Sequence, residues 1–113
     1  MIAGFVVKGD TPVTVLIRGI GPTLTQFGVS GVLANPRLTL LRDTTLITVN
    51  DNWGDLGPAT ISATASSVGA FALPANSLDS AILATLQPGS YTVQVSGASI
   101  TPGVALIEVY EVP

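Results

Sequence analysis

Residues 81–112 read AILATLQPGSYTVQVSGASITPGVALIEVYEV, and this stretch decides the fold. Residues 91–96 alternate apolar and polar side chains, which is typical of a half-buried strand. Residues 104–112 contain no turn former and are apolar on both faces. We therefore expect them to form a strand that its own domain or a neighbour buries on both sides. A further run, residues 81–86, leads into residues 91–96 through Pro88-Gly89. This pair predicts a type II turn, with a positive φ at the glycine.

Patterned runs precede this stretch along the chain. Four have the spacing of strands, the last two joined by a turn at 43–45 as a hairpin: residues 2–8, 13–20, 38–40 and 46–49. Apolar residues at Ile61, Ala65 and Val68 predict one short helix near 58–68, with Pro58 at its first position. Seven or eight strands and this helix predict a single all-β domain over residues 1–113. Its expected architecture is an antiparallel β-sandwich, Ig-like or jelly-roll.

Composition excludes several classes of function. The net charge of −3 and only four basic residues argue against a nucleic-acid partner. No apolar run approaches the roughly 20 residues of a membrane-spanning helix. The chain has no cysteine and no histidine, so disulfides, thiol chemistry and a Ser-His-Asp triad are excluded. Charged residues make up 10% of the chain, against about 25% in a typical globular protein. This low charge, with abundant Thr and Ser, favours an exported protein.

The most polar stretch is a candidate calcium loop. Asn50, Asp51, Asn52 and Asp55 place four oxygen-bearing side chains within six residues. Calcium takes six to eight oxygen ligands, often from one such loop. The spacing is not that of an EF-hand, and no glutamate completes the set. The favoured alternative is an Asx-rich turn whose side chains bond to nearby backbone, with no cofactor bound.

Three other residues or pairs have a possible function and a favoured structural alternative. Trp53 suggests a glycan-stacking platform, but a single tryptophan beside a turn is more typical of a core residue. Asp51 and Asp55 resemble a glycosidase pair only by residue type, since acid–base catalysis needs two carboxyls flanking a cleft. We therefore predict no enzyme activity and no catalytic residues. Arg18 lies on a predicted strand, and we expect it to pair internally with Glu108 or Asp79.

Several motifs recur in one order over essentially the whole chain. They are IAGFVV at 2–7, VLIRGIGPTL at 15–24, FGV at 27–29, LANPRLTL at 33–40, NDNWG at 50–54, VGAFAL at 68–73, LQPGSYTVQVSG at 86–97 and GVALIEVYE at 103–111. Together they resemble the β-sandwich repeat found in tandem in large secreted and surface proteins of environmental bacteria. The second half is also similar to the bacterial pre-peptidase C-terminal domain. These resemblances imply a non-enzymatic module, extracellular or at the cell surface, with a structural or adhesive role. In such arrays a unit abuts its neighbours at Ile2 and Pro113.

The excess of apolar residues near the two ends of the sequence suggests self-association. A monomeric sandwich protects its edge strands with lysine, proline or bulges. The run 2–8 has one lysine, at its end, and residues 104–112 have two glutamates on an otherwise apolar strand. We therefore expect copies to associate head to tail into a filament or array, by sheet-edge addition or by exchange of strand 2–8. The alternative is an accessory or adhesion module that binds a glycan or a protein through loops 21–35 and 50–58. The expected assembly interface comprises Ile2, Phe5, Val7, Val104, Leu106, Ile107, Val109 and Tyr110.

Overall fold

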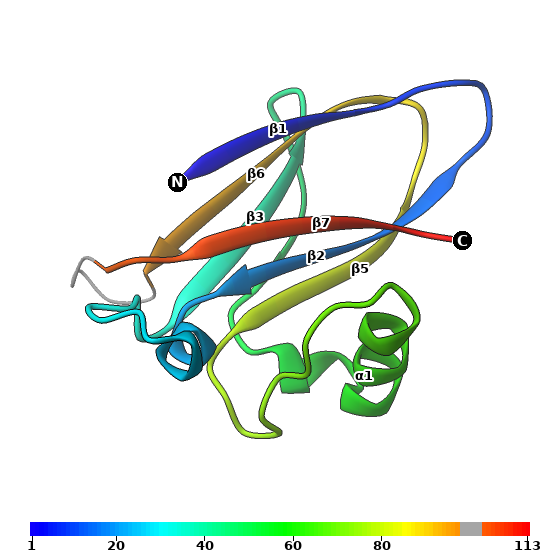
Figure 1. Cartoon of the computed structure of the whole chain (residues 1–113). Coiled ribbons are helices and arrows are strands. Elements are labelled where there is room, and N and C mark those ends of the chain that lie inside the picture. The colour runs from blue at the N-terminus through cyan, green and yellow to red at the C-terminus, as the bar shows by residue number, and fades with distance from the viewer. Residues whose placement is uncertain (98–102) are drawn as a thin grey trace.

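The computed structural model describes residues 1–97 and 103–113 and contains two β-sheets, one α-helix and two short 3-10 helices (Figure 1). The elements in chain order are β1 (Ile2–Val7), β2 (Val13–Ile20), η1 (Pro22–Phe27), β3 (Pro36–Arg42), β4 (Thr45–Asn50), η2 (Trp53–Leu56), α1 (Pro58–Ser67), β5 (Ser80–Leu86), β6 (Gly89–Gly97) and β7 (Leu106–Val112). The strands and the helix lie close to the predicted ranges.

The seven described strands form a sandwich of two antiparallel sheets. The four-stranded sheet has the order β1-β6-β3-β4, and the three-stranded sheet has the order β5-β2-β7 (Figure 1). An apolar core lies between the sheets and includes Ile17, Leu38, Leu40 and Val93, all fully buried. The predicted all-β, antiparallel sandwich is therefore confirmed.

A second core lies on the outer face of the three-stranded sheet, where α1 packs. Consecutive residues of a strand point to opposite faces. In β2, Ile17 joins the core between the sheets, whereas Leu16 packs outward against Trp53 and Ile61. Both faces of β2 are thus buried, and this explains why its sequence reads as a nearly continuous apolar run.

The single helix, α1, begins and ends where the sequence indicates. Pro58 occupies its first turn, where the missing N–H costs no intrahelical bond. Gly69 follows the helix with φ +78°, the left-handed conformation that favours glycine after a C-terminus. Its buried residues are Ile61 and Ala65, which are four positions apart and therefore lie on one face of the helix. This face packs against the sheet.

The predicted hairpin is confirmed, and it contains a bulge. Strands β3 and β4 pair antiparallel around a turn where Asp43 has φ +53°. The register shifts between Leu40 and Leu41. A shift of this kind bends the edge strand and disturbs its regular spacing.

The turn prediction at Pro88-Gly89 is wrong in one respect. Gly89 does not have a positive φ, and it is already the first residue of β6. The connection does not close a hairpin, because β5 and β6 belong to different sheets. A glycine suits this position for another reason: a Cβ there would lie 2.9 Å from Nε of Arg42. Most of the loop predicted at 97–103 lies outside the described residues.

Candidate functional site

The sandwich has an open side, formed by the edge strands β1 and β7. Within the described chain, β1 pairs only with β6, and β7 pairs only with β2. Each strand therefore has one unpaired backbone edge, and no hydrogen bond between described residues joins the two. Figure 1 shows them as the outermost strands of their two sheets. An unpaired edge with apolar side chains is a template for another strand.

A groove of about 430 Å³ lies along this open side. It reaches inward to Val13 and Val15 of β2, so the two sheets are incompletely closed over the core here. Val109 shows the effect most directly. It pairs with Ile17 and so points between the sheets, yet 40% of its surface is exposed. The remaining lining residues are Phe5, Val6, Val7, Lys8 and Glu111.

The predicted interface residues do not form one surface. Ile2, Val104, Leu106 and Val109 are exposed, whereas Phe5, Ile107 and Tyr110 are partly buried and Val7 is buried. Register places Phe5, Val7, Ile107 and Val109 toward the space between the sheets. Leu106 and Tyr110 lie on the outer face of the three-stranded sheet, and Ile2 lies on the outer face of the other sheet. Val104 forms an isolated parallel bridge with Val32.

The opposite side of the sandwich, at β4 and β5, is closed. The side-chain oxygen of Asn50, at the end of β4, accepts a hydrogen bond of 3.1 Å from the backbone N–H of Ala81 in β5. The backbone N–H of Trp53 donates to the carbonyl oxygen of Asp79 over 2.9 Å. The first bond joins β4 to β5, and the second joins η2 to the residue before β5, so hydrogen bonds hold the two sheets together on this side.

The candidate calcium loop contributes to this closure. Asn50 is buried, and besides accepting from Ala81 its amide nitrogen donates to the backbone oxygen of Asn52 over 3.0 Å. Asn52 donates from its amide to Asp51 over 3.3 Å, and Asp55 is exposed. These contacts are those of an Asx-rich turn. Calcium binding at these four residues stays a prediction.

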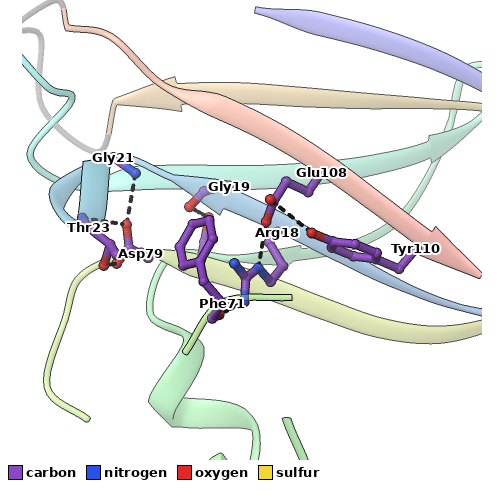
Figure 2. Close-up of polar contacts among 9 residues, drawn as sticks. Arg18, Gly19, Gly21, Thr23, Phe71, Asp79, Glu108 and Tyr110 are labelled. Atoms are coloured by element: carbon purple, nitrogen blue, oxygen red, sulfur yellow. Dashed lines mark hydrogen bonds and ion pairs between the residues drawn. The ribbon is translucent and has the colours of Figure 1, made fainter. Parts of the chain in front are cut away.

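A buried ion pair joins β2 to β7 (Figure 2). Nε of Arg18 donates to Glu108 over 2.7 Å, which selects one of the two expected partners. Nη1 donates to the backbone oxygen of Phe71 over 2.6 Å, and the guanidinium carbon lies 4.4 Å from the centroid of the Phe71 ring. Arg18 is fully buried, and its Nη2 has no hydrogen-bond partner. The ion pair with Glu108 holds β7 against β2, and the bond to Phe71 holds the segment after α1 there as well.

Tyr110 extends this cluster toward the end of β7. Its hydroxyl donates to the second carboxylate oxygen of Glu108 over 2.9 Å (Figure 2). Burial raises the pKa of Tyr110 above its ordinary value, and the hydrogen bond to Glu108 and the negative charge of Glu108 raise the pKa further. Because Glu108 accepts from both Arg18 and Tyr110, both of its oxygens are occupied.

Asp79 organises a second buried cluster that sequence reasoning missed. It lies just before β5 and is fully buried. Its carboxylate accepts bonds from the backbone of Gly21 at 2.8 Å and of Thr23 at 3.3 Å, and from the hydroxyl of Thr23 (Figure 2). The hydroxyl of Ser77 donates a further bond of 2.7 Å. A carboxylate that accepts four bonds ties η1 to the start of β5. The sequence signal for it is weak: an acidic residue directly before the apolar run of β5.

A small hollow lies beneath α1. Its volume is about 130 Å³, and it is walled mainly by apolar side chains that include Trp53, Ile61, Ala65 and Leu73. Trp53 is buried here and its Nε1 donates to the backbone oxygen of Pro74 over 3.1 Å. Trp53 is thus a core residue, as the structural alternative in the sequence predicted, and it presents no ring face for a sugar.

No described helix is long and apolar enough to cross a membrane. Comparison with protein-family models finds no match to the chain, and neither does comparison with curated proteins or with solved structures.

Proposed function

We propose that this protein is a non-enzymatic structural subunit that associates head to tail with copies of itself, outside the cell or at its surface. The observation that carries the proposal is the open side of the sandwich. Two unpaired strand edges, β1 and β7, flank an apolar groove there. The extracellular setting rests on composition: low charge, no cysteine and abundant Thr and Ser.

The exposed apolar surface of these strands supports association. Ile2 is 70% exposed and Val6 is 59% exposed, and β1 contains no charged residue, no proline and no bulge. Strand β7 carries apolar residues on both faces, with one glutamate on each, and its own domain leaves Leu106 and Val109 about 40% exposed. Burying such surface against a second copy is favourable at about 25 cal/mol per Å² of apolar area. The sequence predicts that β7 is buried on both sides by its own domain or by a neighbour, and in this proposal the neighbour is a second copy of the chain.

A pair of matched variants tests the proposal. Val109 and Ile47 are 40% and 41% exposed, but Val109 lines the open side and Ile47 lies on β4 at the other edge of the sandwich. Wild-type protein should form extended particles in negative-stain electron microscopy and a broad, concentration-dependent distribution in sedimentation velocity. We expect Val109→Lys to remove these particles and Ile47→Lys to retain them.

Two results would contradict the proposal. A wild-type protein that sediments as a single-domain monomer at every concentration would exclude self-association. Equal loss of particles in both variants would show that the joint is not at the open side. Circular dichroism spectra of the two variants, compared with wild type, establish that each retains the fold.

A further inference from the structure

We infer that the joint between copies is made by exchange of β1. In this arrangement β1 of one copy leaves its own β6 and pairs with β6 of the next copy, in the same register. The inference rests on the proposed self-association and specifies its partner: residues 2–7 of a second copy of this chain.

The place that β1 occupies is complementary to β1 in detail. Six register pairs join it to β6, from Ile2 with Gln94 to Val7 with Gly89. The ring of Phe5 stacks on Tyr91 with centroids 5.4 Å apart, and Val7 is buried in the core between the sheets. An exchanged β1 recovers all these contacts in the next copy. Exchange of an identical element is for this reason a low-cost route to assembly. Lys8 and Val13, which flank the connector between β1 and β2, line the same groove as Val109. We therefore expect exchanged copies to meet at this groove and to cover Val109 there.

Exchange also accounts for the head-to-tail geometry. A contact of that kind needs two different surfaces on each copy. Strand β1 and the β6 edge that it vacates are such a pair. Simple edge addition within the four-stranded sheet would instead join β1 to β4 of the next copy, and the register shift beside Leu41 makes that edge irregular.

The attachment of β1 permits its release. A single ladder to β6 holds the strand, and no ion pair among the described residues involves it. Residues 8–12, which connect β1 to β2, are all exposed, and Gly9 has φ +91°. Five extended residues span up to about 17 Å, which is the reach that an opened connector gives to β1.

An engineered disulfide distinguishes exchange from other joints. Met1 and Val95 exchange two backbone hydrogen bonds, of 3.2 and 2.9 Å. Hydrogen-bonded and non-hydrogen-bonded pairs alternate along an antiparallel ladder, so Val6 and Ser90 form a non-hydrogen-bonded pair. Such pairs have Cα atoms about 4.5 Å apart, within the range of a disulfide. Both residues are exposed, and the chain has no cysteine of its own.

The test uses the full chain carrying Val6→Cys and Ser90→Cys. After assembly under reducing conditions and then oxidation, we expect a ladder of covalent oligomers on a non-reducing gel, which collapses to monomer with reductant. Each single variant should give at most dimers. If the double variant is oxidised first at low concentration, β1 is locked to its own β6, and this protein should stay monomeric where the reduced form assembles.

The outcomes separate the two proposals. Assembled particles whose disulfides all lie within single chains would overturn β1 exchange and leave self-association standing. Failure of wild-type protein to assemble at any concentration would overturn both. A locked monomer that assembles as well as the reduced form would also overturn exchange.

Discussion

The two sides of this sandwich are built differently. At β4 and β5, a hydrogen bond from the backbone of Ala81 to the side chain of Asn50 joins the two sheets, and the backbone of Trp53 in η2 bonds to Asp79 just before β5. No hydrogen bond between described residues joins β1 to β7, and Val109 is 40% exposed although it points between the sheets. The comparison teaches that closure of a sandwich depends on a few polar crossings at its margin as well as on its core.

The largest expected effect lies on the closed side. Trp53 is 3% exposed and packs between β2 and α1. Trp53→Ala should lower the free energy of unfolding by about 3–5 kcal/mol, because it empties a large core site. Val109→Ala on the open side should cost less than about 1 kcal/mol. Urea denaturation of dilute protein measures both, and losses of similar size would contradict the difference between the sides.

A smaller effect is expected from the polar crossing itself. Asn50→Ala removes the acceptor of the Ala81 N–H and should lower the free energy of unfolding by about 1–3 kcal/mol, because it leaves a buried donor unpaired. Asp51→Ala, the adjacent control, should change it by less than about 0.5 kcal/mol. The calcium prediction leads to a different expectation. If calcium binds this loop, each variant should be less stable than wild type mainly in calcium chloride, and this difference should be smaller in EDTA.

The smallest effect should appear at alkaline pH on the open side. Burial and Glu108 raise the pKa of Tyr110. As the pH rises, the Tyr110 hydroxyl therefore loses its proton in the unfolded chain at a lower pH than in the folded protein. Stability should be complete below about pH 10 and should fall as the pH rises through the higher folded pKa. The Tyr110→Phe variant has no hydroxyl to ionise, so its free energy of unfolding should fall less over this pH range. Urea denaturation between about pH 9 and pH 11 tests the sign, and an identical decline in the variant would contradict it.

Local features of this fold were predictable from the sequence. The bounds of β2 match the predicted range, because Pro12 and Gly21 delimit a run that is rich in β-branched and apolar residues, with Gly19 as its one glycine. The β3–β4 hairpin and α1 are also local, since their signals lie within a few residues of their ends. Burial of the predicted strand at 104–112 was stated as the work of its own domain or a neighbour, and the domain supplies only part of it.

Interactions between distant residues were not predictable in the same way. The partners of Asp79 at Gly21 and Thr23 are 58 and 56 positions away. Asn50 accepts a hydrogen bond from Ala81, which is 31 positions away. In the sequence its side chain resembles a calcium ligand, and in the fold it joins β4 to β5. The strand order also rests on such pairings. For Arg18 the sequence indicated two acids, and only the register of β2 with β7 selects Glu108.

The pairing of β1 with β6 has a consequence for biosynthesis. Met1 and Val95 are hydrogen-bonded but lie 94 positions apart. At about 5–20 residues per second, a ribosome needs on the order of five to twenty seconds to make the segment between them. Throughout that time β1 is already synthesised but its own partner strand is not, and pairings this distant in sequence form slowly. The β1–β6 ladder is therefore expected to form late in folding, after local pairings such as the β3–β4 hairpin.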